Sequence, residues 1–168
     1  IKLDELKDVV QWRIKTIMEG AGCAGRVLYL TGKGNFRIAL ATIQPYKGNR
    51  KDLVKPPHYQ FLRDLFVKEY GAEVIDGMEA DDKLAIEHTR RPDSTVICTR
   101  DKDLLQVAGW HYGWSCGKYI KERKLHEVTE WEGMCSFYKQ MLTGDKVDNI
   151  KGLSGTKQKP GIGPKTAD

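Results

Sequence analysis

The sequence predicts an α/β fold in which a mostly parallel central sheet is covered by helices. Short apolar runs alternate with longer segments in which apolar residues recur at helical spacing, a pattern typical of parallel sheets. The chain has 168 residues, 40% of them hydrophobic, which is enough for a packed core without disulfide or metal staples. With 30% charged residues and no apolar run near the ~20 residues of a membrane span, the composition excludes disordered and membrane-spanning chains.

The first third of the chain is expected to form helix, strand, loop and helix in that order. Apolar residues recur every three or four positions over residues 2–19, which predicts an amphipathic helix. Residues 26–31 form a short apolar run typical of a buried strand. Residues 32–50 show little periodicity, so a loop or mobile segment is expected there. A second amphipathic helix is expected over residues 58–70, after two consecutive prolines.

The middle of the chain is expected to add two strands to the sheet. Residues 72–76 and residues 95–99 are apolar runs, and each is followed by an acidic stretch. A helix is expected between them over residues 79–90, and a short helix after the second strand over residues 101–107.

The last part begins with two expected strands, over residues 110–114 and 118–128. Thr129 and Glu132 then form a capping box, which opens a further helix. The apolar residues of this helix recur at helical spacing and are expected to face the core: Trp131, Met134, Cys135, Tyr138, Met141 and Leu142.

The net charge of +5, from 28 basic and 23 acidic residues, is a weak indication of a nucleic-acid partner. Basic residues gather in residues 44–56 and 150–168, and acidic residues outnumber basic ones over residues 79–103. A DNA-binding surface around an acidic metal pocket would have this pattern, and so would ordinary charge scatter. The four cysteines are scattered without C-x-x-C spacing, which argues against a zinc site or a disulfide scaffold and favours the reducing cytoplasm.

Acidic residues follow the predicted strands and the last predicted helix. Functional side chains collect beyond the carboxyl ends of parallel strands, so these acids can converge. Two like charges about 4 Å apart repel by about 4 kcal/mol at an effective dielectric near 20, so convergence requires a cation. Sites made only of oxygen ligands suit Mg²⁺ or Mn²⁺, and two such ions can activate water for phosphodiester hydrolysis. The acids are Glu79, Asp81, Asp82, Asp101, Asp103, Asp145 and Asp148.

A plainer interpretation stays open for each acid. Asp82 and Asp103 lie where helices are expected to begin, and the helix dipole favours acidic residues there. Asp145 and Asp148 lie beside a glycine and an asparagine and are equally typical of a turn. Under this interpretation the acids are dispersed and hold no ion.

Two basic stretches are suited to phosphate. The segment without periodicity contains four cations that can meet a phosphate or remain solvated: Lys33, Arg37, Lys47 and Arg50. Near the end, Gly161-Ile-Gly-Pro-Lys-Thr166 leads toward a helix start, where the backbone N–H groups can bind phosphate oxygens. A simple Gly-Pro turn is the alternative.

Two common enzyme classes are excluded. Thr31-Gly-Lys-Gly34 is not a Walker loop, because six residues separate Gly25 from Gly32 and a glycine follows Lys33. The four histidines show no metal spacing and no serine lies in a nucleophile elbow, so neither an ATPase nor a hydrolytic triad is expected.

Five motifs in order resemble those of the flap endonuclease and 5′→3′ exonuclease family. They span about residues 46–167, and the ordered set is far more specific than any one of them. The family includes the nuclease domain of bacterial DNA polymerase I and phage exonucleases, of which the phage branch is the more similar. The motifs are Tyr46-Lys-Gly-Asn-Arg50, Glu79-Ala-Asp-Asp82, Thr99-Arg-Asp-Lys-Asp-Leu-Leu105, Leu142-Thr-Gly-Asp-Lys-Val-Asp-Asn-Ile150 and Gly161-Ile-Gly-Pro-Lys-Thr-Ala167.

The resemblance implies a metal-dependent nuclease that cleaves DNA near 5′ ends, flaps or nicks during replication or repair. It implies a nuclease core over residues 1–143 with a flap-endonuclease-like fold. Residues 144–168 would begin a helix–three-turn–helix element that grips duplex DNA around a K⁺ ion. A phage-encoded protein of this kind would work in the host cytoplasm, away from membranes, beside a replication polymerase.

The resemblance also implies roles for single residues. The seven acids would hold two Mg²⁺ or Mn²⁺ ions. Lys47 would approach the scissile phosphate, Arg50 would bind phosphate beside it, and Tyr46 would stack on a base. Further DNA contacts are expected at Lys33, Arg37, Gly161, Gly163, Lys165 and Thr166.

The sequence departs from the family pattern at four places. Family members begin with a strand that ends in an aspartate ligand, whereas Ile1 matches the following helix, so a preceding segment is expected. Gly32 stands where the family often has another aspartate. Residues 154–160 look inserted before the glycine hairpin, and Asp168 falls inside the expected second helix of that element.

Two other functions stay open. The expected but absent first aspartate, together with Gly32, favours a catalytically impaired fragment or a non-catalytic module that binds branched or nicked DNA. A metal-dependent RNase of the PIN type has a similar sheet, but the glycine hairpin argues against it. The intact acidic motifs and Lys47 favour the nuclease.

Overall fold

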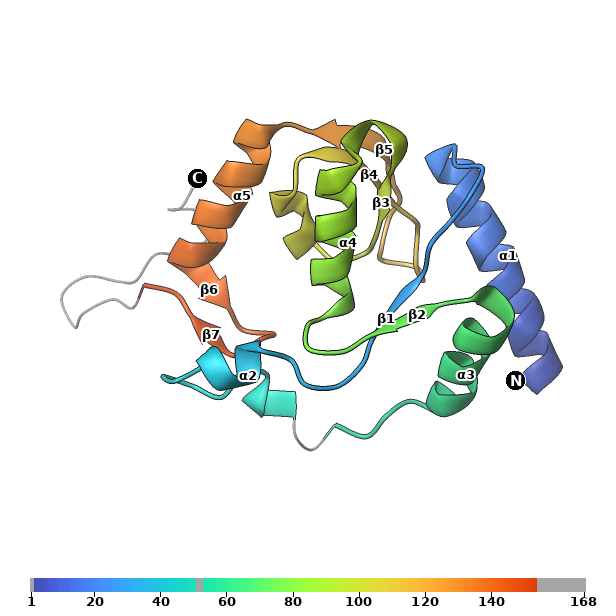
Figure 1. Ribbon diagram of the computed structural model, residues 1–168, viewed down its shortest axis with the longest axis horizontal. Helices are drawn as coiled ribbons and strands as arrows, with labels where there is room; N and C mark the ends of the chain where they lie inside the picture. Colours follow the sequence, from blue (N-terminus) through green and yellow to red (C-terminus); the bar gives the residue numbers. More distant parts are fainter. Residues whose placement is uncertain (1, 51–52, 154–168) are drawn as a thin grey trace.

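The computed structural model describes residues 2–50 and 53–153, and Figure 1 shows their arrangement. The expected helices are present within a few residues of their predicted bounds. The four longer ones are α1 (Leu3–Ala21), α3 (Tyr59–Tyr70), α4 (Ala80–Arg90) and α5 (Glu130–Thr143). The short ones are α2 (Arg37–Leu40) and the 3₁₀ turns η1 (Gly48–Arg50), η2 (Pro92–Ser94) and η3 (Asp103–Gln106).

The strands form two separate sheets and a small hairpin. Strands β1 (Tyr29–Thr31) and β2 (Glu73–Ile75) pair in parallel. Strand β4 (Gly109–Gly113) pairs in parallel with β3 (Ile97–Cys98) and antiparallel with β5 (Arg123–Val128). The hairpin consists of β6 (Gly144–Asp145) and β7 (Ile150–Lys151).

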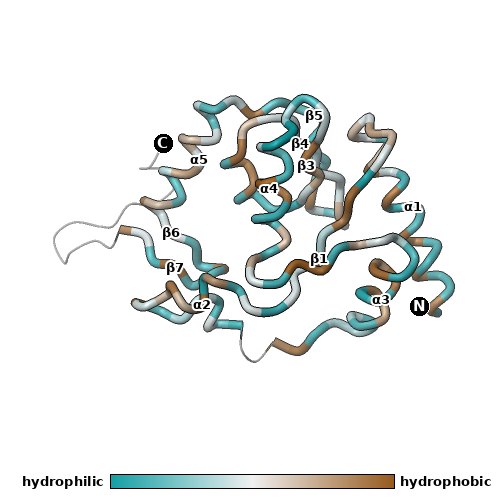
Figure 2. The backbone as a smooth tube through the Cα atoms, viewed as in Figure 1, coloured by the Kyte–Doolittle hydropathy of each residue, from teal (hydrophilic) through white to brown (hydrophobic). Residues whose placement is uncertain are grey.

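The predicted α/β class is therefore correct. The prediction of one continuous, mostly parallel sheet is wrong, because the strands form separate sheets. Among the described residues, no backbone pairing joins β1 to β3, and β5 runs antiparallel. Helix α4 connects the two sheets instead, because it contacts β1 and β2 as well as β3. Figure 2 shows hydrophobic residues along β1 and β3, two of the strands that α4 contacts.

Helix α1 covers β4 and β5. Gly20 allows this close packing, because a Cβ atom there would fall on the ring of Tyr112. Tyr112 and Ile97 are among the buried side chains of the core, which is small and centred on the three-stranded sheet. Within the described residues, no helix is long and apolar enough to cross a membrane.

The expected core face of α5 is wrong. Trp131 is 70% exposed and Tyr138 57% exposed, and Met134, Cys135 and Met141 are exposed as well. The helix packs against η3 through Gly133, where a Cβ atom would lie 2.7 Å from the Gln106 carbonyl oxygen. Periodicity identifies an apolar face, but this close glycine contact determines which side of the helix is covered.

The segment over residues 32–50, expected as a loop, contains α2 and η1 and is fixed by contacts distant in sequence. The Phe36 N–H donates to the Gly77 carbonyl at 3.0 Å, and the Lys47 N–H donates to the Asp148 carbonyl at 3.1 Å. These bonds explain why short helical turns form where apolar periodicity is absent.

Candidate functional site

The predicted acids come from three elements. Glu79, Asp81 and Asp82 lie at the N-terminal end of α4, where the Glu79 N–H donates to the Asp82 carboxylate at 3.0 Å. Asp101 and Asp103 lie in the turn that follows β3, and the Asp103 N–H donates to the Asp101 carboxylate at 2.9 Å. The final pair, Asp145 and Asp148, lies in the β6–β7 hairpin.

The structure brings several of these acids within electrostatic reach of one another. Burial raises the pKa of Asp81, and the charges of Glu79 and Asp101 raise it further. Burial likewise raises the pKa of Asp103, with a hydrogen bond from Lys102 opposing it and the charge of Asp101 adding to it. In the described part of the chain, no cation lies within 4 Å of the Asp81 carboxylate.

Glu79 and Asp148 meet the motif at residues 46–50. The Tyr46 hydroxyl lies 3.0 Å from Glu79 Oε2 and 2.9 Å from Asp148 Oδ2. Lys47 Nζ lies 2.6 Å from Glu79 Oε1 and 3.8 Å from Asp148 Oδ1, and Arg50 Nη2 donates to Asp148 Oδ1 at 2.9 Å. Glu79 is only 8% exposed, so these contacts balance a carboxylate that is largely removed from water.

Asp82 forms an ion pair with Arg37. The two arginine Nη atoms donate to the two carboxylate oxygens at 2.6 Å each. This bidentate pair lowers the pKa of Asp82 and raises that of Arg37. Asp82, predicted as a metal ligand, and Arg37, predicted as a DNA contact, therefore bind each other in the structure.

Asp145 is held by four donors and is 6% exposed. Its Oδ2 accepts from Lys102 Nζ at 3.1 Å and from Gln140 Nε2 at 3.2 Å. Its Oδ1 accepts from the N–H groups of Val147 and Asp148 at 2.7 and 3.3 Å. Burial acts to raise the pKa of Asp145, but these hydrogen bonds outweigh it and the pKa is lowered.

As they stand, these acids do not form a ready metal site. Among the residues that the structure describes, no group of three His, Cys, Asp or Glu is placed to hold an ion. Lys47, Arg50, Lys102 and Arg37 instead provide the positive charge at the carboxylates.

The remaining predicted DNA contacts fall into two sets. Lys33 is exposed, and its N–H donates to the Asp76 carboxylate at 2.7 Å. Gly161, Gly163, Lys165 and Thr166 lie outside the described residues, as do the proposed insertion and most of the C-terminal element.

Sequence reasoning missed three side chains at the site. Lys102 lies between Asp101 and Asp103 in the motif over residues 99–105, and this position could have marked it as a residue of the site. Gln140, in the last turn of α5, donates to Asp145 in β6, and no sequence signal marks it. Asp76 was expected only as the end of a strand, yet its carboxylate lies beside Gly32.

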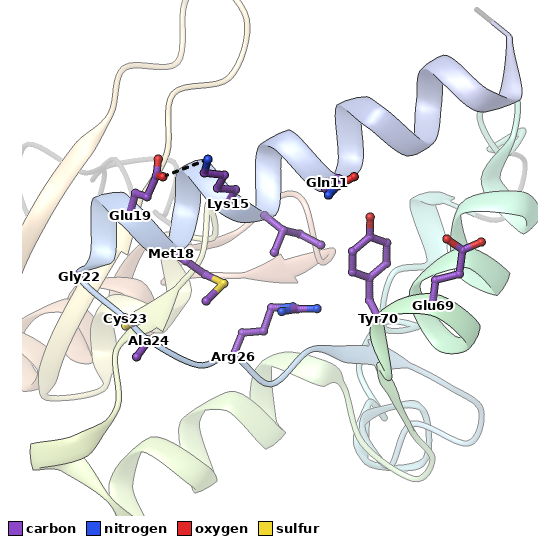
Figure 3. Close-up of a pocket in the computed structure, with 11 residues that line it drawn as sticks. Gln11, Lys15, Met18, Glu19, Gly22, Cys23, Ala24, Arg26, Glu69 and Tyr70 are labelled. Atoms are coloured by element: carbon purple, nitrogen blue, oxygen red, sulfur yellow. Dashed lines mark ion pairs between the residues drawn. The ribbon is translucent and has the colours of Figure 1, made fainter.

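One cavity of the described fold, about 770 Å³, lies between α1, residues 22–26 and α3. Figure 3 shows the Lys15–Glu19 pair on α1, with Arg26 and Tyr70 across from it. None of the candidate acids lines that cavity. A second cavity, about 370 Å³, is lined by Tyr46, by Arg37 and Leu40 of α2 and by residues 41–44, so it lies beside the candidate site.

Comparison with known proteins confirms the expected resemblance. No family model matches the chain. In sequence, the chain is 32% identical over 137 residues to a DNA polymerase I from Rhizobium leguminosarum, which covers 73% of this chain and 12% of that protein.

In fold, the chain is similar to nucleases of bacteriophage T5. A T5 flap endonuclease in a pseudo-enzyme–product complex with DNA and metal ions superposes with a TM-score of 0.66 at 17% identity, covering 92% of this chain and 62% of that chain. A T5 5′-exonuclease mutant gives 0.64 at 15% identity, covering 92% and 60%. The chain thus spans about an eighth of the polymerase and three fifths of the phage proteins.

Proposed function

We propose that this chain, similar in sequence to part of a DNA polymerase I and in fold to the T5 flap endonuclease, is a metal-dependent nuclease. It hydrolyses DNA phosphodiesters at 5′ ends, nicks or flaps. The observation that carries the proposal is the meeting of Lys47 and Arg50 with Glu79 and Asp148. Phosphate-binding cations and candidate metal ligands from three separate segments lie within hydrogen-bonding distance there.

The donor set suits a hard divalent ion such as Mg²⁺ or Mn²⁺. All seven acids offer oxygen ligands, and Asp81 is a crowded carboxylate whose like-charged neighbours call for a cation. Asp81, Asp101, Glu79 and Asp148 would hold the ions, with Asp103 and Asp145 beside them. When bound, the ions lower the pKa of a water molecule and offset charge on the phosphate oxygens.

The chain's own cations bind and orient the substrate. With ions at the carboxylates, Lys47 and Arg50 would be free to bind the backbone phosphate near the scissile bond. Tyr46 lines the 370 Å³ cavity, where an unpaired base can contact its ring. The net charge of +5 supports association with DNA.

The finer assignments rest on the resemblance alone. We place the protein with the phage type, acting in replication or repair beside a polymerase. We propose that the glycine-containing motif over residues 161–166 binds duplex backbone together with a K⁺ ion. These residues lie outside the described part of the chain.

The test is cleavage of a 5′-labelled flap duplex by this 168-residue chain, with Mg²⁺ and with EDTA. Cutting near the junction that requires Mg²⁺ is the expected result. Binding without cutting under all conditions would contradict the nuclease and leave the second candidate, a module that binds branched DNA. The ion pairs that occupy the carboxylates, and Gly32 at a position where an acid is common, favour that candidate.

A further inference from the structure

The Tyr46 hydroxyl lies between two carboxylates that belong to different elements. Its oxygen is 3.0 Å from Glu79 Oε2, at the N-terminal end of α4, and 2.9 Å from Asp148 Oδ2, in the β6–β7 hairpin. A phenol carries one hydrogen and donates it to one acceptor at a time. The two carboxylates therefore share one donor, and both lie within hydrogen-bonding distance of its oxygen.

The loop that carries Tyr46 is docked independently of this hydroxyl. The Lys47 N–H donates to the Asp148 carbonyl at 3.1 Å, and Asn149 Nδ2 donates to the Pro45 carbonyl at 3.0 Å. Arg50 Nε adds a bond to the Val147 carbonyl at 3.1 Å. Because these bonds remain when the phenol oxygen is removed, the loop keeps its place and only the link between the carboxylates is lost.

We infer that Tyr46 is a positioning residue for the acidic site and that it acts through its hydroxyl rather than its ring. The inference deepens the proposed function and rests on it, because Glu79 and Asp148 are taken as ligands of a divalent ion. Hydrogen-bond partners of ligating carboxylates orient them, and their loss weakens metal binding by about tenfold to a hundredfold.

The test compares Tyr46→Phe with the unaltered chain by calorimetric titration with Mn²⁺ alone, without DNA. The expected result is an affinity for Mn²⁺ that is about ten times lower, while the thermal unfolding midpoint in EDTA changes little. Tyr119→Phe is the matched control, because Tyr119 is 89% exposed and makes no hydrogen bond through its hydroxyl in the described structure. An affinity in Tyr46→Phe that is unchanged or tighter would overturn the inference.

A second variant separates the hydroxyl from the ring. In EDTA, Tyr46→Phe is expected to bind a flap duplex as tightly as the unaltered chain, whereas Tyr46→Leu loses affinity for the DNA through the missing ring. Equal Mn²⁺ affinities in Tyr46→Phe and the unaltered chain, with loss only in Tyr46→Leu, would assign the role to the ring and overturn the inference. If the chain binds Mn²⁺ but never cuts DNA, the proposed nuclease function is wrong. The inference about Tyr46 is still decided by the Mn²⁺ titrations.

Discussion

The carboxylate of Asp76 occupies the space that a side chain at Gly32 would fill. A Cβ atom on residue 32 would fall on Asp76 Oδ1 and lie 2.8 Å from the Ile75 carbonyl oxygen. Asp76 is fixed there because its Oδ1 accepts from the Lys33 N–H at 2.7 Å. The glycine at this position is thus required by the local structure, and an acid is still present at the same point of the fold.

Gly32→Ala is expected to lower the free energy of unfolding by about 1–3 kcal/mol, because the new methyl group meets a fixed carboxylate and a backbone oxygen. Urea denaturation followed by circular dichroism measures the change. Gly25→Ala is the matched control, since no atom of another described residue beyond its chain neighbours lies within 4 Å of its Cβ position. In the double variant Gly32→Ala/Asp76→Ala part of the loss should be recovered; simple addition of the two single effects would contradict the contact.

The order of helices and strands could be predicted from the sequence, but the pairing of strands could not. The periodicity of α1 and α3 and the capping box at Thr129 are local signals, and local bonds produce those elements. Whether β1 and β3 share a sheet depends on tertiary contacts between segments far apart in the sequence, and local sequence patterns do not predict those contacts. The exposed stripe of α5 shows the same limit, since Gly133 and not the stripe meets η3.

At the site, residue types were predictable and partnerships were not. Motif spacing marked Glu79 and Asp148, but their joint contact with Tyr46 depends on how the segment over residues 45–50 folds back onto the hairpin. Arg37 was expected to meet DNA, and in the structure it forms a bidentate pair with Asp82. A charge that has two possible partners, substrate and protein, cannot be assigned from spacing alone.

Replacing Asp101 with alanine is expected to abolish flap cleavage and to leave DNA binding largely intact. Asp101 is exposed in the turn after β3 and contributes charge to the acidic group around Asp81. Cleavage with Mg²⁺ and gel-shift binding in EDTA are measured on the same preparation. Asp101→Asn keeps an oxygen acceptor for the Asp103 N–H and serves as the conservative comparison. Loss of binding together with cleavage would count against a metal role.

The variant Asp81→Asn is expected to be more stable than the unaltered chain when metal is absent. Removing the charge relieves its repulsion from Glu79 and Asp101 and the cost of burying it, for a gain of about 1 kcal/mol or less. The midpoints of thermal unfolding are compared in EDTA at neutral pH and then with saturating Mn²⁺. The ion should stabilise the unaltered chain more than the variant, because it uses the carboxylate. If Asp81→Asn is less stable than the unaltered chain in EDTA, the proposed repulsion between Asp81 and the neighbouring acids is contradicted.

Acid is expected to destabilise the fold through two buried histidines. His88 and His111 are each 2% exposed, with ring centroids 6.0 Å apart, and burial lowers the pKa of both. Since the unfolded chain binds protons at about pH 6.5 and the folded chain only at lower pH, the free energy of unfolding falls as the pH drops below about 6.5. The slope is at most about 1.4 kcal/mol per pH unit for each ring.

Urea unfolding between pH 5 and 8 measures how the free energy of unfolding changes with pH. His111→Phe should flatten the profile, and His58→Gln, at an exposed position, should leave it unchanged. A stability that rises toward acid pH would show that the two rings take up protons in the folded state.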